Sequence, residues 1–189
     1  MWKYPYKTKP YEHQKNALNE SAEKVQWAYF MEMGTGKTKV TIDNLAYLFF
    51  KRKVTAALII APKSVYLNWE NEIETHMPDV LKYKIFKWNI DKPKDYHDLQ
   101  NFKDLRIFLI NVEALSTKRG FEACVEYLKT NKLNFVTVDE STTIKNRSAK
   151  RTKNILALQR LSLIRRILTG SPVTKSPLDL YTQCQFLSP

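Results

Sequence analysis

The sequence predicts an α/β fold in which helices cover both faces of a mostly parallel β-sheet. Apolar runs rich in β-branched and aromatic residues alternate with stretches whose apolar residues recur at three- and four-residue spacing. Residues 57–60 and 108–110 are apolar at every position, which is typical of strands buried on both faces. The chain has 189 residues, 43% of them hydrophobic, enough for one well-packed domain of three layers.

The expected elements alternate along the chain. Strands are expected at 25–30, 54–61, 83–88, 106–112, 135–138 and 166–168. Helices are expected at 39–50, 65–76, 121–130 and 149–161. Such alternation forms βαβ units with parallel strands, and ligands then bind beyond the carboxyl ends of the strands. Since the glycines form no linker and no internal repeat is present, we expect a single domain over residues 1–189.

Charge and cysteine content limit the functions to consider. Lys and Arg total 31 against 19 acidic residues, and the net charge of +12 favours a polyanionic partner such as nucleic acid. A solvated basic surface is the alternative. Cys124 and Cys184 lie far apart without CxxC spacing, so neither a zinc site nor a disulfide framework is expected. No apolar run approaches the ~20 residues that span a bilayer, and residues 1–5 lack a signal-peptide core; we expect a soluble, intracellular protein.

Residues 31–38 (MEMGTGKT) follow an expected strand and open an expected helix, the context that a phosphate-binding loop requires. Lys37 is expected to reach the β- and γ-phosphates, and the Thr38 hydroxyl is expected to bind Mg2+. Met31 stands where the strict pattern has glycine, and an ordinary strand-to-helix turn is the alternative. The expected nucleotide-binding residues of the loop are Gly34, Thr35, Gly36, Lys37 and Thr38.

Asp139 and Glu140 supply the acidic pair that a phosphate-loop ATPase needs. They follow residues 134–138 (NFVTV), so both carboxylates emerge at the carboxyl end of an expected strand. Asp139 is expected to hold Mg2+ through water, and Glu140 is expected to polarise the attacking water. With Lys37 they form the expected catalytic set.

The acidic pair and the residues after it resemble motifs of superfamily 2 helicases and translocases, in particular the Swi/Snf-like branch. Residues 139–146 (DESTTIKN) resemble motif II, 168–172 (LTGSP) resemble motif III, and 178–189 resemble the segment ending Phe-Leu-x-Pro. Thr142 replaces the usual histidine of motif II, which leaves open how this motif communicates with motif III.

Two upstream segments extend the resemblance over almost the whole chain. Residues 58–64 (LIIAPKS), with Asn68 and Trp69, are similar to motif Ia. Residues 11–14 (YEHQ) resemble the glutamine motif that reads adenine, within an upstream segment spanning 1–23. The resemblance implies a RecA-like P-loop NTPase lobe in which the Gln14 amide binds adenine.

The resemblance also implies roles outside the nucleotide site. In motif III, a link between nucleotide state and DNA contacts is expected from Thr169, Gly170 and Ser171. Contacts to DNA phosphates are expected from Lys63, Ser64, Asn68, Lys145, Asn146 and Arg147. Trp69 is expected to anchor its helix in the core.

The expected function is the ATP-binding lobe of a DNA-dependent ATPase that uses ATP and Mg2+ to translocate on or remodel duplex DNA. The resemblance implies a second RecA-like lobe that this chain lacks, with the arginine finger in that lobe. A cytoplasmic or nuclear location is expected. The alternatives are a packaging-type P-loop motor and a catalytically silent basic module that binds nucleic acid.

Overall fold

A parallel β-sheet forms the centre of the protein. A computed structural model describes residues 4–91, 99, 101–173 and 176–188. Within them the sheet has six strands in the order β1-β6-β5-β2-β4-β3, and all of its pairings are parallel. The strands are β1 (Gln26–Phe30), β2 (Ala56–Ala61), β3 (Tyr83–Lys87), β4 (Leu105–Asn111), β5 (Asn134–Val138) and β6 (Ile164–Thr169). The predicted α/β class with a parallel sheet is confirmed.

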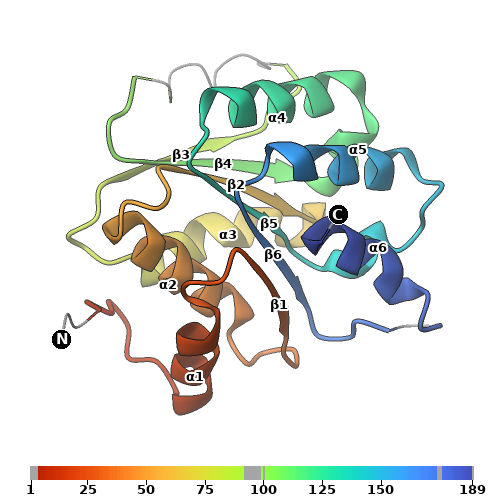
Figure 1. The fold of residues 1–189 in the computed structure, drawn as a ribbon. Coiled ribbons are helices and arrows are strands. Elements are labelled where there is room, and N and C mark those ends of the chain that lie inside the picture. Colours follow the sequence, from red (N-terminus) through yellow and green to blue (C-terminus); the bar gives the residue numbers. More distant parts are fainter. Residues whose placement is uncertain (1–3, 92–98, 100, 174–175, 189) are drawn as a thin grey trace.

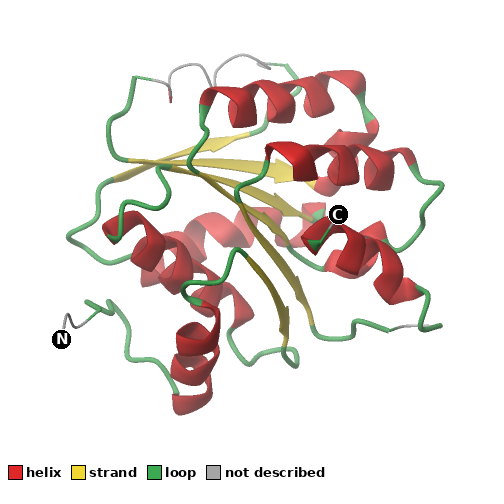
Figure 2. Cartoon of the chain, viewed as in Figure 1, coloured by secondary structure: helices red, strands yellow, loops and turns green. Residues whose placement is uncertain are grey.

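Helices cover both faces of this sheet, which gives three layers (Figures 1 and 2). One face carries α1 (Glu12–Ser21), α2 (Lys37–Phe50) and α3 (Lys63–His76). The opposite face carries α4 (Lys118–Thr130), α5 (Lys150–Leu158) and α6 (Asp179–Leu187). Short 3-10 helices follow several strands and helices: η2 (Val112–Ser116), η3 (Ser141–Ile144) and η4 (Gln159–Leu161).

The alternation of side chains along each strand builds two separate cores. In β2, Ala57 and Ile59 pack under α2 and α3, whereas Leu58 and Ile60 pack under α4 and α5. Every residue of β2 is buried, because helices lie against both faces of the strand. The apolar run 57–60 predicted a strand with helices on both faces, and the structure confirms this prediction.

The predicted elements match the observed ones closely at the centre of the sheet and less well at the two ends of the chain. The helices α1 and α6 were not predicted; α1 places only Leu18 among the buried apolar residues. The predicted helix 149–161 consists of α5 followed by η4. The last predicted strand, 166–168, begins earlier in the structure, at Ile164, so Arg165 also lies inside β6. Residues 1–3 and the final Pro189 of the predicted motif lie outside the described residues.

All carboxyl ends of the strands meet at one edge of the sheet, because all pairings are parallel. Strand β6 lies between β1 and β5, and Thr169 at its end pairs with Phe30 at the end of β1. The loop after β1, the acidic pair after β5 and the motif III segment after β6 therefore begin side by side. This strand order places the predicted site residues together.

Candidate functional site

The predicted phosphate loop connects β1 to α2 and has the backbone that its glycines allow. Gly34 and Gly36 have φ values of 77° and 85°, in the left-handed region that favours glycine. A Cβ at Gly36 would collide with the side-chain nitrogen of Gln14. The left-handed backbone therefore favours glycine at position 36, and a side chain there would also displace the Gln14 amide. Helix α2 starts at the next residue, so its N-terminal N–H groups open toward the loop.

Lys37 lies along the inside of the loop. Its Nζ donates to the backbone oxygens of Met31 at 3.0 Å and Glu32 at 3.1 Å, and the residue is 9% exposed. The cation and the N-terminus of α2 place positive charge at the same point, an arrangement that suits the phosphates of a nucleotide.

Asp139 and Glu140 follow β5 and face this loop. Asp139 is 6% exposed, and its two carboxylate oxygens accept from the backbone N–H of Glu140 at 2.8 Å and from Trp69 Nε1 at 2.9 Å. Glu140 has a φ of 45°, a left-handed conformation that is costly for a residue with a side chain. This turn directs the chain from β5 into η3 immediately after the second carboxylate.

Both carboxyl groups have raised pKa values, and burial is the main cause for each. Burial raises the pKa of Asp139, while the hydrogen bonds from Trp69 and the Glu140 N–H oppose the increase. Burial also raises the pKa of Glu140, and the charge of Asp139 raises it further. A carboxylate with a raised pKa is a better proton acceptor, which suits a group that polarises water.

A cavity of about 280 Å³ joins these groups. It is lined by Met33, Gly34, Gly36, Lys37, Thr38, Val65, Glu72, Asp139 and Glu140. The predicted loop residues and the acidic pair thus share one space, with α3 as its third wall. A cation, a hydroxyl and two carboxylates around a glycine-lined loop are the groups that phosphoryl transfer from a metal-bound nucleotide requires.

Gln14 lies beside the loop, in the first turns of α1. Its Oε1 accepts from the Tyr11 backbone N–H at 3.0 Å, and its Nε2 donates to the Thr35 oxygen at 3.0 Å. The side chain is buried and holds α1 against the phosphate loop. Tyr11 is exposed, and its ring stacks on His13 with centroids 5.8 Å apart. The predicted adenine contact of Gln14 remains a prediction.

The motif III segment touches the phosphate loop directly. A Cβ on Gly170 would lie 3.1 Å from the Cγ of Met33, so glycine permits this approach. Thr169 is buried at the end of β6, and its hydroxyl accepts from the Ser171 N–H at 3.2 Å. Gly170 therefore adjoins the phosphate loop, with Thr169 and Ser171 on either side of it in the chain.

A buried glutamine that sequence reasoning missed connects motif II with motif III. Gln183, on α6, accepts from the Ser141 hydroxyl at 2.6 Å and donates to the Pro172 oxygen at 2.9 Å. Ser141 directly follows Glu140, and Pro172 directly follows Ser171. Gln183 therefore joins the two segments, and how motif II communicates with motif III remains a prediction. Nothing in the sequence singled out Gln183, because its burial between Ser141 and Pro172 depends on where α6 packs.

Two further missed residues come from α3. Trp69 was expected only as a core anchor; it is buried and also hydrogen-bonded to Asp139. Glu72 lines the cavity, and its Oε2 lies 3.3 Å from His76 Nε2. The helical spacing of Val65, Trp69 and Glu72 puts them on one face, a signal that was present in the sequence.

The predicted DNA-contacting residues lie in two segments near the same edge of the sheet; all of them are exposed except Lys145, which is half-buried. Lys63, Ser64 and Asn68 are exposed on the first turns of α3, after β2. The second segment follows η3, after the neighbouring strand β5; the guanidinium of Arg147 there lies 4.2 Å from the Tyr181 ring centroid. Asn146 Oδ1 accepts from the Ser148 N–H and hydroxyl at 3.0 and 2.8 Å, which shapes the turn before α5.

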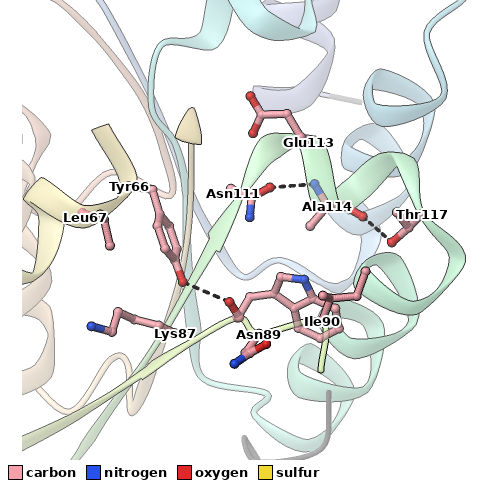
Figure 3. A pocket seen from close by; sticks show the side chains of 10 residues that line it. Tyr66, Leu67, Lys87, Asn89, Ile90, Asn111, Glu113, Ala114 and Thr117 are labelled. Atoms are coloured by element: carbon pink, nitrogen blue, oxygen red, sulfur yellow. Dashed lines mark hydrogen bonds between the residues drawn. The ribbon is translucent and has the colours of Figure 1, made fainter. Parts of the chain in front are cut away.

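A second, larger cavity of about 660 Å³ lies at the carboxyl ends of β3 and β4, next to α3 (Figure 3). The Tyr66 hydroxyl donates to the Trp88 oxygen at 3.3 Å across its floor, and Asn111 Oδ1 accepts from the Ala114 N–H at 2.9 Å on its far wall. Leu67 and Ile90 are exposed at its rim. This cavity contains no residue of the phosphate loop and no acidic pair, so the smaller cavity is the candidate catalytic site.

Fold and site together define a RecA-like P-loop lobe. A family model described as "SNF2-related domain" matches residues 23–189. The chain belongs to this SNF2-related family, which confirms the Swi/Snf-like resemblance of its motifs.

Similar proteins agree with this family. The chain is 28% identical over 160 residues to "Probable ATP-dependent DNA helicase CHR12" of Arabidopsis thaliana and 30% identical over 158 residues to "DNA annealing helicase and endonuclease ZRANB3" of Mus musculus. Each match covers 84% of this chain and 14% of the relative. The fold is similar to that of the Sulfolobus solfataricus SWI2/SNF2 ATPase core in complex with dsDNA, with a TM-score of 0.76 and 24% identity over 100% of this chain and 38% of that chain.

Proposed function

We propose that this chain is the ATP-binding lobe of a DNA-dependent ATPase that translocates on or remodels duplex DNA. The observation that carries the proposal is the convergence of Lys37 and the Asp139–Glu140 pair on one glycine-lined cavity. Membership of the SNF2-related family supports it. The chain spans a small part of the curated relatives that it matches, 14% of their length; the proposal therefore concerns one lobe of a larger enzyme.

The residues around the cavity have distinct proposed roles. Lys37 exchanges its bonds to loop carbonyls for bonds to the β- and γ-phosphates, and the backbone N–H groups of the loop bind the phosphate oxygens. Thr38 and Asp139 hold Mg2+, which neutralises phosphate charge when bound. Glu140 orients the attacking water and accepts its proton. Gln14 binds the adenine edge.

The fit of Mg2+ to this donor set rests on the geometry of the side chains. Mg2+ prefers oxygen ligands and usually takes one or two from the protein, together with phosphate oxygens and waters. Thr38 and Asp139 provide a hydroxyl and a carboxylate on the same cavity. Each Asp139 oxygen accepts one hydrogen bond and retains a lone pair for a water or a cation.

Duplex DNA is the proposed polyanionic partner. The net charge of +12 and the exposed Lys63, Ser64, Asn68, Asn146 and Arg147, with Lys145 half-buried beside them, support backbone contacts without sequence preference. We place the enzyme in the compartment that holds DNA, the cytoplasm or the nucleus. Among the described residues, no helix is long and apolar enough to cross a bilayer.

A second RecA-like lobe is proposed to complete the enzyme. Phosphoryl transfer gains from an arginine that stabilises transition-state charge. Arg165 and Arg166 do not fit this role, because both are buried in β6 and bonded to backbone oxygens.

The family match does not favour a packaging-type motor. A catalytically silent module is the remaining alternative. A measurement of nucleotide affinity distinguishes it from the proposed ATPase lobe.

Lys37→Ala tests the proposed site. The substitution removes the side-chain cation that the loop directs at the phosphates, so we expect a loss of affinity for a fluorescent ATP analogue, measured by anisotropy. Lys82→Ala is the matched control, because Lys82 is exposed and precedes β3; its affinity should equal that of the wild type. Equal binding by wild type and Lys37→Ala would contradict the site, and no binding by the wild type would favour the silent module.

A further inference from the structure

The catalytic aspartate is hydrogen-bonded to a tryptophan that is far from it in the sequence. Trp69, on α3, donates from Nε1 to Asp139 Oδ2 at 2.9 Å, across a separation of 70 residues. The indole is 2% exposed. A buried indole N–H needs an acceptor, and here the acceptor is the carboxylate that faces the phosphate loop.

The position of the Asp139 carboxylate is fixed from several directions. Its Oδ1 accepts from the Glu140 N–H at 2.8 Å, and its backbone N–H donates to the Ile60 oxygen at 2.8 Å. The backbone bond fixes where the side chain starts. The bonds to Oδ1 and Oδ2 then fix the rotation of the carboxylate plane, and the bond to Oδ2 comes from an indole.

We propose that Trp69 is a positioning residue of the metal site, which holds the Asp139 carboxylate in the orientation that binds Mg2+. This inference rests on the proposed function, since it concerns the metal of the same site. Partners that orient the ligands of a metal ion contribute about 10- to 100-fold to metal affinity in other proteins. Trp69 binds no nucleotide in this proposal and acts only through Asp139.

A packing role alone would give a different result. The indole also packs in the core beneath α2 and α3 with Ile59, Ile73 and Leu109. If packing were its only contribution, replacing the indole would lower the stability of the fold and leave the metal dependence of nucleotide binding unchanged. If it positions Asp139, the metal-dependent part of nucleotide affinity falls and the metal-independent part remains, because the loop and Lys37 are unaltered.

The position of Trp69 on α3 connects the proposed DNA contacts of this helix with Asp139. Trp69 follows Asn68 on the helix that begins with Lys63 and Ser64, residues proposed to contact DNA. Through one hydrogen bond, the helix that carries these residues is attached to the carboxylate of the metal site. A shift of α3 would therefore act on Asp139 directly.

The test compares Trp69→Phe with the wild type in two conditions. Affinity for a fluorescent, non-hydrolysable ATP analogue is measured by anisotropy with Mg2+ and with EDTA, and the ratio of the two affinities gives the contribution of the metal. We expect this ratio to fall by about tenfold or more in Trp69→Phe, with affinity in EDTA unchanged. Trp88→Phe is the control: Trp88 is also buried and packs on Phe108, with ring centroids 6.4 Å apart, but lines the other cavity. Its ratio should equal that of the wild type.

A second variant separates the hydrogen bond from the shape of the ring. Replacing Trp69 by β-(3-benzothienyl)alanine keeps the bicyclic ring and puts sulfur where the N–H was; it should reproduce the lowered ratio. A wild-type ratio in this analogue, or in a folded Trp69→Phe, would overturn the inference and leave the proposed function intact. Wild-type binding that is equal with Mg2+ and EDTA would also overturn it. Absence of wild-type binding in both conditions would overturn the proposed function and the inference with it.

Discussion

At the scale of single residues, the environment of the nucleotide cavity is defined by charged groups between α2 and α3. His76 illustrates this. Its Nδ1 lies 2.6 Å from the Thr8 hydroxyl and its Nε2 lies 3.3 Å from Glu72, which lines the cavity. Burial lowers the pKa of His76, and the nearby charge of Lys39 lowers it further, while Glu72 and Asp43 oppose the decrease. The neutral imidazole is therefore the form that the folded protein favours.

This lowered pKa predicts a pH-dependent contribution to stability. The unfolded chain protonates His76 near pH 6.5, before the folded protein does. The contribution is therefore complete above that pH and is lost as the pH falls through the lower, folded pKa. We expect the difference in unfolding free energy between wild type and His76→Gln to shrink or reverse on acidification, measured by urea unfolding at several pH values. His97 lies outside the described residues, and the matched control is His13→Gln at an exposed position. A pH-independent difference for His76→Gln would contradict the assignment.

At the scale of elements, the two ends of the chain are connected through buried polar side chains. Arg166 of β6 is 0% exposed and donates to Asn44 Oδ1 at 2.9 Å, to the Ser21 oxygen at 3.1 Å and to the Lys24 oxygen at 2.8 Å. These bonds connect the last strand to α1, to α2 and to the loop before β1. Gln183 has the same kind of role on the other face of the sheet, between η3 and the loop after β6.

Arg166→Leu should therefore destabilise the whole domain. It removes the guanidinium donors and leaves the buried Asn44 Oδ1 without its Arg166 partner, while the Ser21 oxygen keeps the bond from the Lys24 N–H; we expect a loss of about 3 kcal/mol by analogy with broken buried polar networks. Urea unfolding followed by circular dichroism measures it. Arg160→Leu, at an exposed position in η4, should leave the midpoint nearly unchanged. Equal midpoints for the two variants would show that the Arg166 network contributes little.

At the scale of the whole molecule, the basic charge predicts how the chain binds DNA. If Lys63, Lys145 and Arg147 each neutralise one phosphate, the logarithm of the affinity for duplex DNA should fall against the logarithm of salt concentration with a slope of about −3. Anisotropy titrations with duplexes of unrelated sequence should give similar affinities. Replacing the three cations by alanine should flatten the slope. Strong preference for one sequence, or affinity independent of salt, would contradict the proposed contacts.

The proposed second lobe leads to a prediction about turnover. The cavity contains the proposed phosphate-binding, metal-binding and water-polarising residues, whereas the arginine finger is proposed to come from another lobe. We expect the 189-residue chain to hydrolyse ATP near background. A protein that also contains the second lobe should show a DNA-stimulated rate higher by about 10³-fold or more. Phosphate release assays with and without duplex DNA measure both. Robust DNA-dependent turnover by the 189-residue chain would show that the second lobe is not needed.

The sequence by itself determined the fold class and most of the candidate catalytic site. Fully apolar runs such as 57–60 require burial on both faces, and local rules of spacing give the phosphate loop and the acidic pair. Local information suffices here because the loop residues are contiguous and each strand carries its own pattern. The order of the motifs along the chain indicated the family, which the SNF2-related match confirmed.

Only the tertiary structure decided which distant side chains act on these groups. The Trp69–Asp139 bond, the Gln183 bridge and the Arg166 network each join residues that are far apart in the sequence. Such pairings depend on strand order: β6 lies between β1 and β5, and this placement brings motif III against the phosphate loop. A buried donor must find an acceptor, but the sequence does not show which one packing will bring within reach.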